Sequence, residues 1–200
     1  MNYLAHLYFA DNNSDSRIGN LLGDFCRGVD VSLLSETTKA GLAQHRAIDR
    51  FTDQYADIRS AKMLFSKERR RFAGVALDLV FDHYLVKHWS LFSVMPFEIY
   101  KKQLYQQLWQ ERPLMPAPMA HTMGYLVQQD WFGSYAELSN IGEALDRIAA
   151  RLRFANHFAG CIDDLSHNEA AFEQLFLQFF PQLQLFVQQY RADNPIAPRF

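Results

Sequence analysis

Three ionisable side chains interrupt the apolar segment 72–86, which reads FAGVALDLVFDHYLV. Asp78 and Asp82 stand four residues apart, so in a helix both carboxylates lie on one face, with His83 beside the second. Burying a carboxylate without a compensating cation is unfavourable by several kcal/mol. We therefore expect an arginine from another helix or a divalent metal ion to face this pair.

The alternative for a buried aspartate is a structural role, as an ion-pair partner or as a cap for a neighbouring helix. The four-residue spacing and the adjacent imidazole favour a functional site, because ionisable groups with perturbed pKa values cluster at such sites. Aspartate and histidine together are ligands of metal-dependent hydrolases. The segment therefore predicts a metal site.

The stretch HRAIDRFTD offers a second helical face of this kind. His45, Asp49 and Asp53 follow one another at four-residue steps, and Arg46 and Arg50 form a parallel row. Arg–Asp ladders are common on exposed helices and contribute little, and we interpret Asp53 in this way. His45 and Asp49 are predicted to meet the carboxylates of the first segment. The arginines favour a phosphate-containing substrate, because guanidinium groups bind phosphate oxygens bidentately.

A third motif, GNLLGDFCRG, places two glycines inside a predicted short helix. Gly19 and Gly23 each cost about 1 kcal/mol relative to alanine in a helix, so they predict close approach of another backbone or of a ligand. Asp24 is a candidate third carboxylate of the site, and Arg27 is a candidate phosphate ligand. His6 alone, in a short apolar helix, is more typical of a hydrogen-bonded core residue.

Several other chemistries have no support in the sequence. It contains no GxSxG motif, no P-loop and no dinucleotide-binding fingerprint. Its two cysteines form no CxxC pair, which argues against a disulfide framework or a zinc ribbon. The net charge of −2 does not indicate nucleic-acid binding. The candidate residues therefore indicate a metal-activated water that attacks an electrophile, with phosphorus favoured by the arginines.

The composition predicts the fold class. Of the 200 residues 49% are hydrophobic, glycine and proline are scarce, and no strand pattern is visible. We expect one all-α domain over residues 1–200, a compact bundle of about eight helices with a loose tail at 191–200. The pattern predicts one long helix over 35–65 and another that begins at Ser66. No signal peptide and no run of roughly 18 apolar residues is seen, so a cytoplasmic location without a membrane span is expected.

Four ordered motifs together resemble those of the acyl carrier protein phosphodiesterases, also called acyl carrier protein hydrolases. They are MNYLAHLYFA, GNLLGDFCRG, HRAIDRFTD and LDLVFDHYLVKHW, all within the first ninety residues. The family is a distant branch of the HD-type metal phosphohydrolases, so the resemblance implies an HD-domain-like fold. It also implies a metal-dependent phosphodiesterase that uses Mn²⁺, with Mg²⁺ as a possible substitute. Such an enzyme cleaves 4′-phosphopantetheine from the serine of holo-acyl carrier protein and leaves apo-carrier.

The resemblance also implies where the site residues lie. The metal ligands are expected among seven residues: His6, Asp24, His45, Asp49, Asp78, Asp82 and His83. The pair Asp82-His83 departs from the usual His-Asp order, which leaves the individual ligand roles open. Asp49 or Asp24 is the expected general base, and Arg27 and Arg46 are expected to neutralise charge on the phosphoryl oxygens.

An acyl carrier protein is small and acidic, so its enzyme needs a basic docking surface. The run KERRR supplies Lys67, Arg69, Arg70 and Arg71 just before the first segment. Two other interpretations remain open: an HD-type phosphohydrolase that acts on a nucleotide, and a non-enzymatic helical binding module whose buried Asp–Arg and His–Asp pairs are structural.

Overall fold

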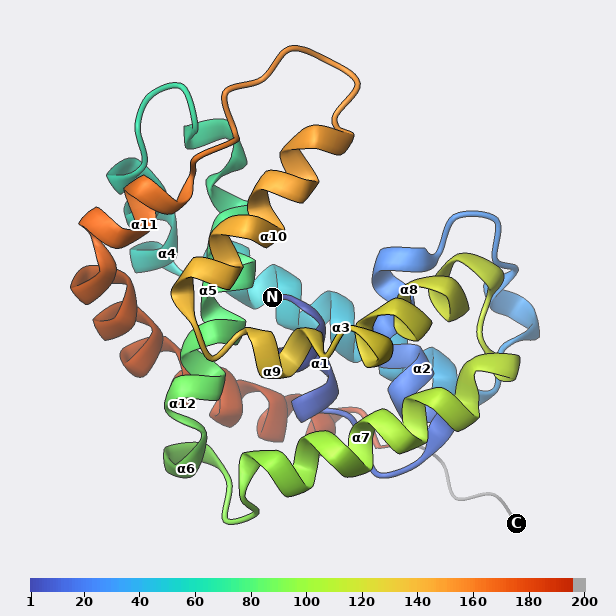
Figure 1. Ribbon diagram of the computed structural model, residues 1–200. Coiled ribbons are helices and arrows are strands. Elements are labelled where there is room, and N and C mark those ends of the chain that lie inside the picture. The colour runs from blue at the N-terminus through green and yellow to red at the C-terminus, as the bar shows by residue number, and fades with distance from the viewer. Residues whose placement is uncertain (196–200) are drawn as a thin grey trace.

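The computed structural model describes residues 1–195, and over this range the chain is all-helical (Figure 1). The all-α prediction is confirmed. The first half contains α1 (Tyr3–Tyr8), α2 (Ser14–Leu22), α3 (Glu36–Gln54), α4 (Ala56–Ala61), α5 (Ala73–Lys87) and α6 (Trp89–Phe92). The second half contains α7 (Phe97–Glu111), α8 (Ala117–Gln128), α9 (Trp131–Ser134), α10 (Leu138–Arg151), α11 (Ile162–His167) and α12 (Glu169–Asp193). The short 3₁₀ helices are η1 (Gly23–Phe25), η2 (Val31–Leu33), η3 (Lys62–Leu64), η4 (Arg70–Phe72) and η5 (Arg112–Leu114).

The twelve α-helices of residues 1–195 outnumber the eight expected, because long predicted helices are divided. The helix predicted over 35–65 begins as expected, with the Ser35 hydroxyl capping the amide of Thr38 at 3.1 Å. It breaks at Tyr55, whose extended backbone separates α3 from α4. Ser66 does not start the next helix, since its amide and hydroxyl both donate to Asp164.

At the other end of the chain, α12 continues to Asp193, so the first residues of the predicted tail are helical. Arg191 fastens this end to the core, because its Nε donates to Gln44 Oε1 at 2.7 Å and it also donates to the carbonyl of Phe9. Residues 196–200 of that tail lie outside the described part of the chain. None of the helices within residues 1–195 is long and apolar enough to cross a bilayer.

Helix α5 runs through the middle of the core and is buried on nearly every side. It packs against α1, α10 and α12. Phe81 of α5 contacts Phe176 and Phe179 of α12, with ring centroids 5.6 and 5.7 Å apart. An ionisable group on α5 must therefore find its partner inside the protein.

Helices α2 and α3 touch backbone to backbone. A Cβ atom on Gly19 would lie 2.9 Å from the Cα of Gly41 and would overlap the carbonyl oxygen of Thr38. This confirms the close approach that the glycine predicts. The contact aligns the two helices so that Gln44 Nε2 donates to Asn20 Oδ1 at 3.0 Å.

The α2–α3 contact yields a first prediction. The substitution Gly19→Ala should lower the free energy of unfolding by about 1–3 kcal/mol, because the added methyl meets backbone that cannot move aside. Gly74→Ala is the matched control, since its Cβ would have only Lys62 Nζ nearby, at 3.9 Å. That control should be neutral or stabilising by up to about 1 kcal/mol. Urea unfolding followed by circular dichroism measures both, and equal stabilities would contradict the packing argument.

Candidate metal centre

Two histidines and one aspartate form a cluster of potential metal ligands, the single group of this kind within residues 1–195. His6 comes from α1, and His45 and Asp49 come from successive turns of α3. Their ligand atoms all lie within 4.8 Å of one another. The two imidazole rings are stacked, with centroids 3.8 Å apart. Both histidines are buried, while the Asp49 side chain is 40% exposed.

The hydrogen bond of His45 to the backbone decides how its ring can act. Nδ1 lies 2.7 Å from the carbonyl oxygen of Asn20, which can only accept, so Nδ1 carries the proton and donates. In the neutral ring Nε2 then has a free lone pair, and it lies 3.0 Å from Oδ2 of Asp49. Two acceptors that face each other need a cation between them, either a proton or a metal ion.

Gly23 makes room for this ring. A Cβ atom at that position would overlap the imidazole of His45. The second glycine of the GNLLGDFCRG motif therefore marks the close approach of a side chain, whereas the sequence predicted the approach of another backbone or of a bound ligand. The same turn brings Asp24, the next residue, to the edge of the cluster.

Both ring nitrogens of His6 are buried without a hydrogen-bond partner. Nδ1 and Nε2 are both buried and form no hydrogen bond of acceptable geometry, although Nε2 lies 3.2 Å from Oδ1 of Asp49. Burial lowers the pKa of His6 to about 3, so the ring is neutral at pH 7 and offers a lone pair. An unsatisfied buried nitrogen costs about 1–3 kcal/mol. A metal ion bound by His6 would satisfy the nitrogen that carries the lone pair, so the residues present fit such an ion.

The cluster carboxylate Asp49 and the neighbouring Asp78 both contact a positively charged group of the protein. The amino group of Met1 is buried and lies 2.9 Å from Asp78 and 3.4 Å from Asp49. Although burial lowers it, these two carboxylates raise the pKa of that amino group to about 10. Burial acts to raise the pKa of Asp49, yet the neighbouring imidazoles and the amino group hold it well below its ordinary value. Asp78 therefore borders the cluster.

Asp82 does not point at the cluster, because both of its oxygens are already engaged. They accept hydrogen bonds from the amides of Leu4 and Ala5, each at 3.0 Å. The partner of this buried carboxylate is thus the amino end of α1, instead of the arginine or metal ion that we expected. Burial raises the pKa of Asp82 to about 7, although the two amide donors act in the opposite direction. Its role in this geometry is to hold α1 so that His6 reaches the cluster.

The remaining predicted residues lie around or away from this centre. His83 is turned away from it, since Nδ1 meets the carbonyl oxygen of Tyr135 at 2.7 Å. Asp24 is exposed at the edge, but the surrounding protein displaces enough water to raise its pKa. Arg46 is exposed and lies 3.8 Å from the sulfur of Cys26, the residue before Arg27.

Asp53 lies outside this centre and is exposed, as its interpretation as a surface residue predicts. It pairs with Lys62 at 3.6 Å, so its partner is a lysine and not an arginine of the predicted ladder. The amino group of Met1 and the carbonyl of Asn20 are main-chain groups, which carry no side-chain signature, so the sequence could not reveal their part in the site.

Comparison with known proteins identifies the family of the chain. A family model described as acyl carrier protein phosphodiesterase matches residues 1–183. The acyl carrier protein phosphodiesterases of Serratia proteamaculans and Pectobacterium atrosepticum are 36% and 33% identical to this chain, over 92% of it and 95% of each relative. The relative of the same name from Escherichia coli O157:H7 is 33% identical over the same shares.

The chain belongs to the acyl carrier protein phosphodiesterase family. The resemblance carried by the four motifs is thereby confirmed. Each motif supplies a part of the centre or its support: α1 with His6, the α2–η1 turn with Gly23, α3 with His45, and α5 with Asp78. No solved structure matches the chain, and the kinship with HD-type folds stays a prediction.

Gly23 provides a test that separates the site from the fold. Gly23→Ala should displace the His45 ring, because the added methyl would occupy its place. A side chain can turn aside where backbone cannot, so the helical content should stay near native. We expect the affinity for Mn²⁺ to fall by about 10–100-fold, as when support of a metal-binding histidine is lost. Isothermal titration calorimetry measures the affinity, with Gly74→Ala as the control. Unchanged affinity would remove His45 from the ligand set.

Proposed function

We propose that this protein is a metal-dependent phosphodiesterase that removes 4′-phosphopantetheine from holo-acyl carrier protein. The observation that carries the proposal is the facing pair of His45 Nε2 and Asp49 Oδ2, 3.0 Å apart, which calls for a cation in a member of a family named for this activity. His6 completes a set of two imidazoles and one carboxylate. Asp78 is the proposed further ligand at the rim of the same site.

Mn²⁺ is the proposed metal. Mg²⁺ prefers oxygen ligands and octahedral geometry, and two of the three clustered donors are imidazoles, which disfavours Mg²⁺. The choice of Mn²⁺ among the remaining divalent ions rests on the family resemblance. A divalent ion held there would lower the pKa of a bound water and polarise a phosphoryl oxygen.

The residues of the chain have separate tasks in this proposal. The buried rings of His6 and His45 hold their lone pairs in place and exclude water from one side of the centre. Asp24, with its raised pKa and exposed position, is suited to take or return a proton during attack on phosphorus. Arg27 and Arg46, both exposed near that edge, are proposed to bind the non-bridging oxygens.

Docking of the carrier is proposed on the exposed part of segment 67–71. Arg69 is engaged internally, since it donates to the carbonyls of His157 and Ala159 at 3.3 and 3.2 Å. Arg70 donates to the carbonyl of Phe65 at 3.3 Å. The docking role therefore narrows to Lys67 and Arg71, which are exposed.

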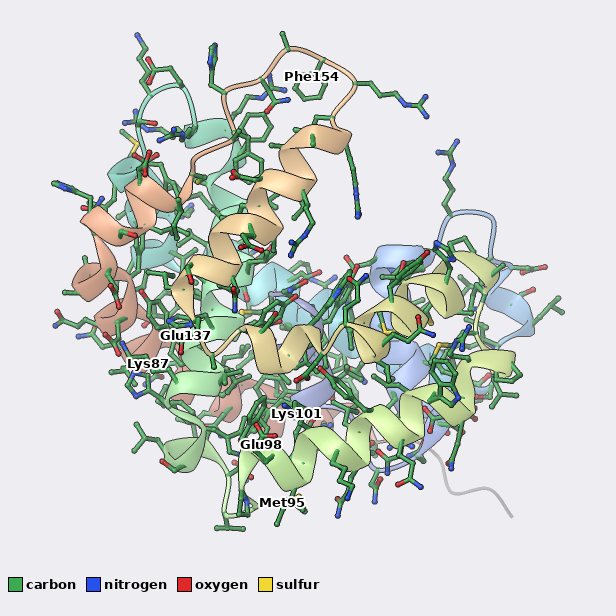
Figure 2. All side chains as sticks on the ribbon, viewed as in Figure 1. Lys87, Met95, Glu98, Lys101, Glu137 and Phe154 are labelled. Carbon is green, nitrogen blue, oxygen red and sulfur yellow. The ribbon has the colours of Figure 1, made fainter. Side chains whose placement is uncertain are left out.

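Figure 2 shows Phe154 on the loop that follows α10. The guanidinium of Arg71 lies 5.1 Å from the centroid of the Phe154 ring. This contact holds Arg71 at the surface, where an acidic partner can reach it.

The activity is tested by mass spectrometry of the carrier. Purified protein with Mn²⁺ should convert holo-carrier to apo-carrier, and excess chelator should stop the conversion. Asp49→Ala and His45→Ala should lose at least about 100-fold in kcat/KM, since even loss of an outer contact to a ligand costs 10–100-fold. Asp53→Ala, one turn along α3 and paired only at the surface, is the control and should keep wild-type activity.

Other results would each point to a different function. Metal-dependent hydrolysis of nucleotides without any conversion of the carrier would favour the nucleotide phosphohydrolase. Absence of metal binding would favour the structural binding module. Full activity of Asp49→Ala would relocate the centre.

The docking surface is tested by charge reversal. Lys67→Glu combined with Arg71→Glu should raise KM for holo-carrier and change kcat little, because steering acts mainly on association. The effect should shrink as salt increases, since the Debye length is about 10 Å at 0.1 M. Lys102→Glu, on the exposed face of α7, is the matched control and should leave KM unchanged. A collapse of kcat with constant KM would place these residues in the active site or in the fold.

A further inference from the structure

A cavity of about 210 Å³ lies beside the start of α1, where α5, α8, α9 and α10 converge. Its walls combine apolar side chains with hydrogen-bonding and basic groups. Leu79, Trp131 and Ile148 supply apolar surface, and Arg147 and Arg151 supply positive charge. In Figure 1, α9 lies in front of α1 and α10 crosses α5, which places these helices around the chain start. Ligand cavities typically pair an apolar lining with a few convergent polar groups.

The cavity adjoins the metal centre through residues 2 and 3. Asn2 lines the cavity and directly follows Met1, whose amino group contacts Asp49 and Asp78. Tyr3 also lines it, and its ring packs against Phe25 at a centroid distance of 6.0 Å. Burial and the charge of Asp24 raise the pKa of Tyr3 to about 12, while Arg151 acts in the opposite direction. Tyr3 therefore stands between the carboxylate edge of the centre and the basic rim of the cavity.

We propose that this cavity binds the pantetheine arm of the substrate, next to the phosphodiester that is cleaved. The inference rests on the proposed function and deepens it by assigning the site that recognises the prosthetic group. The arm carries a branched apolar segment next to its phosphate, followed by two amides. Leu79 and Ile148 match the apolar segment, and Asn2 and Ser134 offer hydrogen bonds to the amides.

The size and charge of the cavity agree with this occupant. Sites for drug-sized ligands measure about 300–1,000 Å³, so about 210 Å³ holds part of an extended arm and leaves its thiol end outside. Arg151 is exposed at the rim and places positive charge where the phosphate joins the arm. Asn2 and Tyr135 line the same wall of the cavity, so their polar groups lie together on one side of it.

The cavity is tested by filling it. Ala144 lines it on α10, whereas Ala150 lies on the exposed face of the same helix. Ala144→Phe in the Mn²⁺-loaded protein should weaken binding of 4′-phosphopantetheine at least tenfold in calorimetry. The smaller Ala144→Leu should give a smaller loss. Ala150→Phe should bind like wild type. All three variants should keep wild-type affinity for Mn²⁺, which shows that the centre is intact.

Two results would overturn the inference: 4′-phosphopantetheine binding equally to Ala144→Phe and Ala150→Phe, or failing to bind wild type. In parallel, mass spectrometry of holo-carrier reports on the proposed function. If wild type converts the carrier and Ala144→Phe matches its kcat/KM, the cavity assignment is wrong and the function stands. If wild type binds 4′-phosphopantetheine in an Ala144-dependent manner but leaves the carrier unchanged, the cavity stands and the function is wrong.

Discussion

The candidate site depends on one buried carboxylate. Asp82 of α5 is fully buried and accepts the amides of Leu4 and Ala5, so it caps a helix that lies 78 residues earlier in the chain. Helix α1 has only six residues, too few to be stable by itself. The hydrogen bonds to Asp82 and burial against α5 give α1 a defined place. His6 and Tyr3 reach the metal centre and the cavity because α1 is held there.

A second constraint acts on the opposite side of the centre. Gly19 and Gly41 let α2 and α3 approach until their backbones touch, and this closeness puts the carbonyl of Asn20 within reach of His45. Gly23 then leaves the space that the imidazole fills. Gly19 and Gly41 lie inside α2 and α3 and weaken these helices locally. In return, the backbone sets the tautomer and the direction of the His45 ring.

The sequence predicts which residues lie near the candidate site better than it predicts their hydrogen-bond and ion-pair partners. The spacing correctly placed Asp78 and Asp82 on one face of α5, since Asp78 meets the Met1 amino group and Asp82 meets the next turn of α1. The spacing did not identify the partners of these two aspartates. The partners are main-chain groups, which every residue type carries, so the sequence cannot indicate which of them bind. His83 follows Asp82 directly, and a one-residue step turns a side chain about 100° around a helix axis, toward Tyr135.

Helix boundaries and surface charges were predictable to different degrees. The Ser35 cap marked the start of α3, whereas its end at Tyr55 depends on tertiary packing against Phe179, with ring centroids 5.0 Å apart. The run 67–71 predicts a basic docking surface formed by Lys67, Arg69, Arg70 and Arg71. Arg69 and Arg70 are instead used to satisfy carbonyl groups of nearby loops, which only the three-dimensional arrangement of those loops could show.

The burial pattern around the candidate centre leaves it accessible from one side only. His6 and His45 are closed off by α1, α2 and α3, while Asp49 is 40% exposed and Asp24 is open to solvent. In the proposed function, a phosphodiester would approach from the carboxylate side. There a metal ion and the nearby arginines would add to the charge of the Met1 amino group in offsetting Asp24, Asp49 and Asp78. Without that compensation, the negative charge of the carboxylate edge would repel an anionic substrate. In the proposed function, metal binding and substrate binding would thus be coupled by charge, because the ion that completes the ligand set would also offset the charge that repels a phosphate.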